Sequence, residues 1–234
     1  MAYLPRCTGL TTTVLLLAAL TSCTTHTTAS SDAAKASPRT SSSTSVDQAP
    51  LAPLAYGPGP QSTYTVQAQP AAGSCHYGND HGQPLPDTKC TPGALSPAVT
   101  QATVGTTICR SGGYTGTIRP PVGITNKEKA ANAQSYGYTG ALHDAEYDHL
   151  ISLQLGGDPN DPRNLWVEPP SPGHQAGAGP NNPKDAVETR LHTAICKNQV
   201  TLTAAQQAIA TDWETAEQRL GLKPDPSDTS GPAD

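Results

Sequence analysis

The sequence contains no phenylalanine, and aromatic residues make up only 4% of its 234 positions. Hydrophobic residues reach 35%, so the chain is too poor in large apolar side chains to pack a core along its whole length. No apolar run approaches the ~20 residues that a membrane-spanning helix requires, which excludes a polytopic membrane protein. One modest domain with disordered flanks is the expected organisation.

Basic residues are also scarce. The chain has 14 Lys and Arg against 19 Asp and Glu, and its formal net charge is −5. This balance excludes a strongly basic nucleic-acid coat, because nonspecific binding to phosphate backbones relies on clustered basic side chains. If the substrate is a nucleic acid, we expect its binding to be weak and sensitive to salt.

Residues 1–23 have the pattern of a secretory signal peptide. Arg6 provides a positive start, and an apolar stretch follows from Leu10 to Leu20. The stretch ends in Leu-Thr-Ser-Cys, which resembles a bacterial lipobox and predicts lipidation of Cys23. Ordinary secretion with cleavage nearby is the alternative. Both place the mature protein outside the cytoplasm, either secreted or held by acyl chains on the outer face of the plasma membrane.

Three further regions follow from composition. Residues 24–72 are rich in Thr, Ser, Ala and Pro, and they predict a disordered tether that buries little apolar surface. Residues 73–222 have the length of a single ordinary domain, and residues 223–234 resemble the tether. No segment indicates an oligomer, so a monomer is expected.

Four cysteines remain beyond the predicted signal peptide: Cys75, Cys90, Cys109 and Cys196. An even number outside the cytoplasm predicts disulfides, and four cysteines allow three pairings. We favour Cys75–Cys90, which would staple a local Gly/Pro-rich loop, and Cys109–Cys196, which would tie the front of the domain to a late helix. A zinc site is the weaker interpretation, because the chain has no CxxC motif.

Caps and periodicity outline the secondary structure of the domain. Thr125 with Glu128 forms a capping-box pair that predicts a helix to about residue 136. Residues 147–155 and 164–167 read as two short strands separated by a Gly-Gly turn. Helices are then expected from residue 182, with Val187, Leu191 and Ile195 facing inward, and over residues 202–220.

The segment YDHLISLQLGGDPNDPRNLWVEPP at residues 147–170 resembles the HNH family of nucleases, and NNPKD at 181–185 resembles the end of the motif in members with Asn as third residue. The resemblance covers about residues 143–197. It implies an α+β fold in which a small ββα-metal finger is embedded in a mainly helical, disulfide-stapled single domain.

The resemblance assigns a role to each polar residue of the motif. It implies that His149 is the general base, that Asn164 orients His149, and that Lys184 contacts phosphate. Asp148 and Asn181 would hold a divalent ion, most simply Mg²⁺, with Mn²⁺, Ni²⁺ or Zn²⁺ as alternatives. Three other residues of the helix can replace Asn181 as ligand: Asp185, Glu188 and His192.

The residue types suit this chemistry on physical grounds. Hydrolysis of a phosphodiester needs a deprotonated water and a cation near the phosphate. A histidine with the usual pKa near ~6.5 is largely neutral at pH 7 and accepts a proton. Adjacent strand residues point to opposite faces. Asp148 and His149 can therefore act together only where the strand ends or bulges.

The sequence thus predicts a secreted, metal-dependent hydrolase, an HNH-type endonuclease that cuts DNA with low sequence specificity, with RNA as a further candidate substrate. The alternative is a non-catalytic, disulfide-stapled surface lipoprotein that uses a degenerate ββα finger as a binding scaffold.

Overall fold

The computed structural model describes residues 53–223, which form a mixed α+β fold with two disulfides. The strands are β1 (Ala55–Tyr56), β2 (Gly78–Asp80), β3 (Gln83–Leu85), β4 (Ala94–Leu95), β5 (Glu146–His149) and β6 (Leu165–Glu168). The helices are α1 (Val122–Ser135), α2 (Lys184–Cys196), α3 (Leu202–Thr211) and α4 (Ala216–Arg219). Within these residues the strands pair into three two-stranded sheets, which are β1–β4, β2–β3 and β5–β6.

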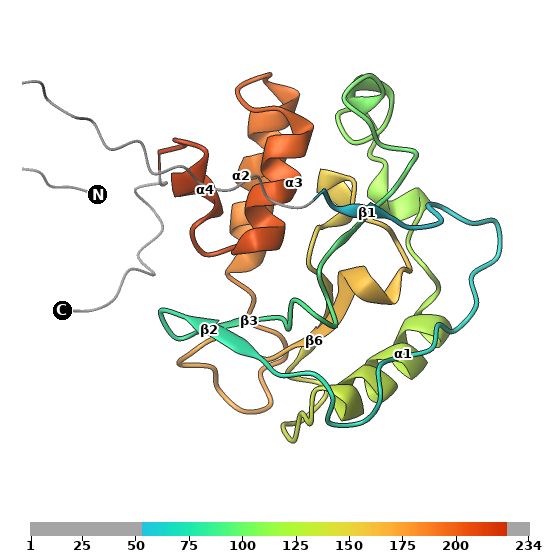
Figure 1. The fold of residues 1–234 in the computed structure, drawn as a ribbon, viewed down its shortest axis with the longest axis vertical. Helices are drawn as coiled ribbons and strands as arrows, with labels where there is room; N and C mark the ends of the chain where they lie inside the picture. Colours follow the sequence, from blue (N-terminus) through green and yellow to red (C-terminus); the bar gives the residue numbers. More distant parts are fainter. Residues whose placement is uncertain (1–52, 224–234) are drawn as a thin grey trace, which may run out of the picture. The chain divides into compact units, whose positions relative to one another are not determined.

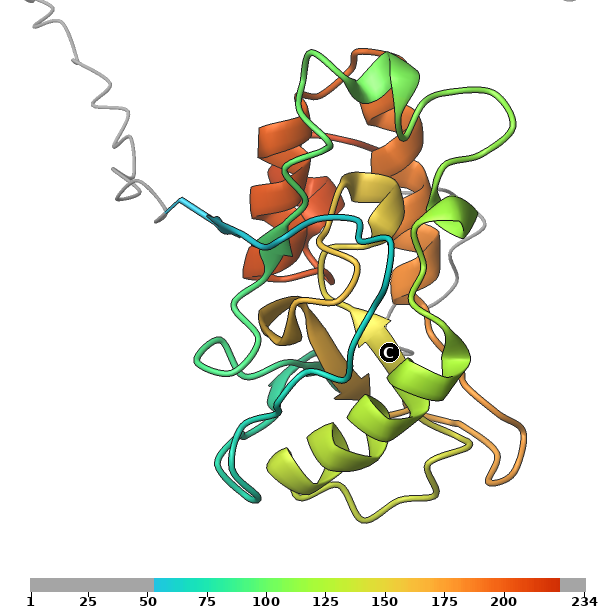
Figure 2. The ribbon, with the colours of Figure 1, turned by 90° about the vertical axis from the view of Figure 1, so that its right-hand side faces the viewer.

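The antiparallel hairpin of β5 and β6 lies at the centre of the described chain (Figure 2). Its register pairs Asp148 with Trp166 and His149 with Leu165. Helix α1 packs against the hairpin through a small cluster that includes Ala133 and Val167. The hairpin is thereby fixed on one side by a helix that precedes it in the sequence.

The connection between β5 and β6 depends on Gly157. A Cβ atom at this position would lie 1.7 Å from the carbonyl oxygen of Ile151 and 2.7 Å from the side chain of Asn164. Only a glycine allows the backbone to approach this closely. The preceding Gly156 has a φ of 78°, in the left-handed region that glycine adopts without strain.

The main hydrophobic core lies among α2, α3 and α4, which pack side by side (Figure 1). The predicted inward face of α2 is confirmed, because Val187, Leu191 and Ile195 are all buried in this core. The prediction of one helix over residues 202–220 is wrong. The chain leaves helical geometry at Asp212, whose carboxylate accepts hydrogen bonds from the Glu214 amide and the Thr215 hydroxyl, a local alternative to helical backbone bonding.

Both disulfides have the expected pairing. Cys75 is bonded to Cys90 and Cys109 to Cys196. The first closes a loop next to the end of α1, where the Cys75 amide donates to the carbonyl of Ser135 over 3.0 Å. The second links the segment before α1 to the last residue of α2. Two disulfides in one domain fit a secreted or extracellular protein.

Two element boundaries differ from the sequence prediction. The first strand ends at His149, and Leu153–Leu155 form a 3-10 helix instead of continuing it. Helix α1 starts at Val122, directly after a proline, three residues before the predicted capping box. Glu128 does not cap this helix, because its carboxylate accepts the amide of Gln67 over 2.7 Å.

The ordered domain also starts earlier than residue 73. Strand β1 pairs in parallel with β4, and the Tyr64 hydroxyl donates to the carbonyl of Ile118 over 2.6 Å. Composition predicted a tether here because residues 53–72 contain few aliphatic side chains. They are held by polar and backbone hydrogen bonds instead, including one from the Asn160 amide to the carbonyl of Thr65.

The predicted signal peptide, the lipidation site Cys23 and most of the predicted tail lie outside the described residues. Between residues 53 and 223, no helix is both long and apolar enough to cross a membrane.

Candidate functional site

Asp148 and His149 occupy the end of β5, as their joint use requires. His149 is the last residue of the strand, and each of the two is only 6% exposed. Their side chains have different partners. The Asp148 carboxylate binds Lys184, whereas the His149 ring contacts the carbonyl oxygen of Pro159. At the strand end, the Asp148 carboxylate therefore faces a lysine, whereas the His149 imidazole faces a backbone carbonyl.

The Pro159 contact determines which nitrogen of His149 is free. Nε2 of His149 lies 3.0 Å from the Pro159 carbonyl oxygen, which can only accept a hydrogen bond. Nε2 therefore carries the proton, and Nδ1 keeps its lone pair. Burial lowers the pKa of His149 to about 4, against the opposing effects of the Pro159 bond and the Asp148 charge. The ring is neutral at pH 7, the form that a general base needs.

Lys184 is fully buried at the start of α2. Its ammonium donates to Oδ2 of Asp148 over 2.6 Å, to the carbonyl of His149 over 2.9 Å, and to the carboxylate of Glu188. Each of the three N–H groups of the ammonium therefore has a hydrogen-bond acceptor. Burial alone would lower the pKa of Lys184, but the facing carboxylates raise it above its usual value. Lys184 faces these carboxylates and is not exposed for the phosphate contact that the family resemblance implied.

The carboxylates around Lys184 outnumber it. Glu146 and Glu168 lie opposite each other across the hairpin, and the Asn182 amide donates to both, over 3.2 and 3.1 Å. Burial, reinforced by the Asp148 charge, raises the pKa of Glu146 and of Glu168. These acidic groups therefore retain protons more readily than free carboxylates do, because burial disfavours their charged form and the nearby Asp148 charge adds to this effect.

Such a donor set fits a hard divalent cation. Carboxylate oxygens are the ligands that Mg²⁺ and Mn²⁺ prefer, and the excess of negative charge favours a second positive charge. Asp185 lies on the first turn of α2 with an exposed side chain. Neighbouring atoms still shield its carboxylate partly from water, and this partial burial, followed by the Asp148 charge, raises the pKa of Asp185. Among the described residues, the acidic side chains do not bring three ligand oxygens within 4.8 Å of one another, so a metal site at this cluster stays a prediction.

Asn164 is buried and does not contact His149 directly, in contrast to its expected role. Its Oδ1 accepts the amide of Ile151 over 3.0 Å, and its Nδ2 donates to the carbonyls of Ile151 and Asp158, also over 3.0 Å. Asp158 precedes Pro159, whose carbonyl receives His149. Asn164 therefore positions the His149 ring indirectly, because it fixes the loop that carries the Pro159 carbonyl.

Asn181 has an exposed side chain. Its backbone carbonyl accepts the amide of Ser171 over 3.3 Å. The neighbouring Asn182 reaches the acidic cluster instead. Among the alternatives to Asn181, Glu188 belongs to that cluster, Asp185 lies at its edge, and His192 is next to the Cys109–Cys196 disulfide.

Sequence reasoning assigned no role in the site to Glu146, Glu168 or Asn182, and no individual role to Arg119. Glu146 precedes Asp148 by two residues, so the period of a strand places both side chains on one face. That signal was available in the sequence. Arg119 is exposed, and its positive charge acts on both His149 and Asp185. It is the basic side chain that the structure brings near the candidate site.

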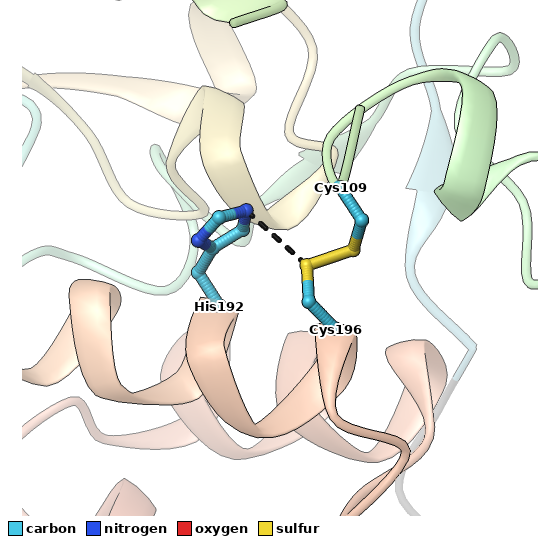
Figure 3. Close-up of side chains that lie close together, drawn as sticks. All are labelled: Cys109, His192 and Cys196. Carbon is cyan, nitrogen blue, oxygen red and sulfur yellow. Dashed lines mark hydrogen bonds between the residues drawn. A yellow bond between two sulfur atoms is a disulfide. The ribbon is translucent and has the colours of Figure 1, made fainter. Parts of the chain in front are cut away.

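A second cluster of potential ligands lies at the other end of α2. His192 and Cys196 point from one face of the helix toward Cys109, and Nε2 of His192 is 3.4 Å from Sγ of Cys196 (Figure 3). The ligand atoms of the three residues all lie within 4.8 Å of one another.

Comparison of the chain with protein-family models, with curated proteins and with solved structures gives no match. Its function is therefore inferred from the chemistry of these sites.

Proposed function

We propose that the protein is a metal-dependent endonuclease of the HNH type that hydrolyses phosphodiester bonds of DNA, with RNA as a further candidate substrate. The observation that carries this proposal is the hydrogen bond from Nε2 of His149 to the Pro159 carbonyl, which leaves Nδ1 unprotonated on the residue that follows Asp148. The order of hairpin and helix, β5, β6 and α2, is also that of a ββα finger.

In the proposed hydrolysis of a phosphodiester, each residue of the site has its own role. Nδ1 of His149 accepts a proton from a water molecule, and the water oxygen attacks phosphorus. The P–O3′ bond breaks and the leaving O3′ takes a proton from solvent water, which gives a 5′-phosphate and a 3′-hydroxyl. A divalent ion held by Asp148 and Asp185 would neutralise the negative charge that grows on the phosphate.

Two basic residues have separate roles in this proposal. Lys184 fixes Asp148 and Glu188, because its ammonium is buried between them. Arg119 is exposed and its positive charge acts on His149 and Asp185, so it replaces Lys184 as the side chain proposed to contact substrate phosphate. With Arg119 as its single proposed phosphate contact, the protein should bind DNA weakly, and log affinity should fall against log salt with a shallow slope of about −0.9.

A second function, the non-catalytic binding scaffold, is favoured by one observation. The Lys184 ammonium already neutralises the Asp148 carboxylate within a buried network, as a purely structural ion pair would. In that case the finger stabilises the domain, and the surface around it binds a cell-wall or protein partner.

Nicking of supercoiled plasmid by the oxidised full chain separates the two functions. The enzyme should convert supercoiled to open-circular DNA with Mg²⁺ or Mn²⁺, and EDTA should stop the reaction. A folded protein that nicks no DNA with either ion, and whose melting temperature is the same with and without EDTA, would support the scaffold.

We also propose that Cys23 carries the lipid anchor. The Leu-Thr-Ser-Cys sequence supports this, and the test is membrane fractionation of a Cys23→Ser variant. Loss of the variant from the membrane fraction is expected, whereas unchanged membrane association would contradict lipidation.

A further inference from the structure

We propose that Cys109, His192 and Cys196 form a zinc site when the Cys109–Cys196 disulfide is reduced by a dithiol. The site lies eight residues along α2 from Lys184, a distance of about 12 Å at the helical rise of 1.5 Å per residue. It is separate from the acidic cluster, and the proposal does not depend on nuclease activity.

The ligand types of Cys109, His192 and Cys196 indicate which metal the site would prefer. Two thiolates and one imidazole suit Zn²⁺, whereas Mg²⁺ prefers oxygen ligands. His192 and Cys196 are four residues apart on α2, so both side chains lie on the same face of the helix. Cys109 enters from the segment that follows the 3-10 helix at Val104–Thr106 (Figure 3). All three residues are partly exposed, which gives a metal ion access.

The geometry needs little rearrangement. With Zn–S bonds of about 2.3 Å and Zn–N bonds of about 2.0–2.1 Å, tetrahedral ligand atoms lie roughly 3.5 Å apart. Nε2 of His192 and Sγ of Cys196 are already 3.4 Å apart. Once the sulfur–sulfur bond is broken, the Cys109 thiolate has to swing away from Cys196, and the His192 ring has to turn Nε2 from the Ile108 carbonyl toward the ion. A water molecule can complete the coordination.

Protons and electrons balance in two steps. The dithiol transfers two electrons and two protons to the disulfide, which gives two cysteine thiols and the oxidised, cyclic form of the reductant. Zn²⁺ binding then releases both thiol protons. Nε2 of His192 now donates to the carbonyl of Ile108 over 2.9 Å, so its proton must move to Nδ1 when Nε2 binds the ion.

The bound ion would preserve the cross-link that the disulfide provides. Zn²⁺ would join the Cys109 segment to the end of α2 in the reduced protein, at the place where the covalent bond joins them in the oxidised protein. The same three residues would then hold the domain together in two redox states.

The test uses the full chain with Cys7→Ser and Cys23→Ser, so that no other thiols outside the domain bind metal. Both disulfides are reduced with a dithiol, excess reductant is removed anaerobically, and Co²⁺ is added as a spectroscopic probe. We expect one Co²⁺ per chain, a near-ultraviolet thiolate-to-cobalt absorption, and displacement of Co²⁺ by Zn²⁺. The oxidised protein should show no such absorption.

Three variants locate the site. The absorption should vanish in Cys109→Ser/Cys196→Ser, which keeps the other two cysteines, and persist in Cys75→Ser/Cys90→Ser. Because loss of a group that merely supports a ligand lowers metal affinity about 10–100-fold, His192→Asn should lower Zn²⁺ affinity at least about tenfold.

Circular dichroism of the same samples reports whether the reduced protein is folded. Absence of Co²⁺ binding by the reduced chain, folded or unfolded, overturns the proposal. Absorption that survives in Cys109→Ser/Cys196→Ser, or an unchanged Zn²⁺ affinity of His192→Asn, overturns it as well.

Discussion

The Lys184 ammonium lies 2.6 Å from Oδ2 of Asp148, and the lysine side chain is completely buried. This pair joins the first residue of α2 to the strand end that carries His149. It holds the helix, the hairpin and the acidic cluster in one arrangement, and its removal should lower the stability of the domain and the proposed nuclease activity.

Replacement of Lys184 by Met should destabilise the domain strongly. The substitution leaves Asp148 and Glu188 buried without their cation, and loss of one partner of a buried ion pair costs about 3–5 kcal/mol. Urea denaturation of the oxidised protein measures this. The double variant Asp148→Asn/Lys184→Met should recover part of the loss, and strictly additive effects of the two substitutions would contradict a direct pairing.

Stability should depend on His149 below neutral pH. The folded-state pKa is lowered to about 4, so the unfolded chain binds a proton at higher pH than the folded chain does. The stabilisation is complete above pH ~6.5 and is lost as pH falls toward 4, by roughly 3 kcal/mol in total for this buried group. Denaturation curves between pH 4 and 7 check this. If His149→Gln has the same slope against pH in that window, the assignment is wrong.

Gly157→Ala should prevent the hairpin connection from closing. Its Cβ would meet the Ile151 carbonyl at 1.7 Å, and this backbone atom cannot move aside without breaking the bonds to Asn164. We expect a loss of more than about 3 kcal/mol or a failure to fold. Gly105→Ala is the matched control, since an added Cβ there meets nothing within 4 Å. Equal melting temperatures of the two variants would contradict the described connection.

The two disulfides should differ in how much each contributes to the free energy of unfolding. Cys75–Cys90 closes a separation of 15 residues and Cys109–Cys196 one of 87. The loop-entropy model gives about 3 and about 4.6 kcal/mol, respectively. Thermal denaturation of the two double-serine variants tests the order, and a greater loss on removing Cys75–Cys90 would show that local strain or packing outweighs loop entropy.

Much of the domain could be read from local sequence. The hairpin, the inward face of α2 and both disulfides follow from periodicity, turn residues and cysteine placement. The first strand was extended too far because Leu150, Ile151 and Leu153 resemble a buried strand. The Asn164 side chain takes both backbone groups of Ile151, so no neighbouring strand can pair there. The β5 strand therefore ends because of one side chain, Asn164, that lies 13 residues after Ile151 in the sequence.

The site was less accessible to local reasoning. Asp148 and His149 stand together in the sequence, but the predicted strand over residues 147–155 placed them near its start, whereas the observed strand ends at His149. The burial of Lys184 was not predicted, because this burial depends on carboxylates that come from two strands and a helix. A lone lysine at a helix start carries no sign of such neighbours and is usually exposed.

The most direct test of the nuclease proposal is the Mg²⁺-dependent nicking rate of His149→Ala beside His143→Ala. His143 is an exposed histidine six residues earlier that contacts Asp144, so it controls for loss of an imidazole. We predict that His149→Ala lowers the rate about 10²–10⁴-fold, the usual contribution of a general base, while His143→Ala nicks at the wild-type rate. Equal rates for His149→Ala and the wild type, with both proteins folded, would contradict the role of His149 as the base.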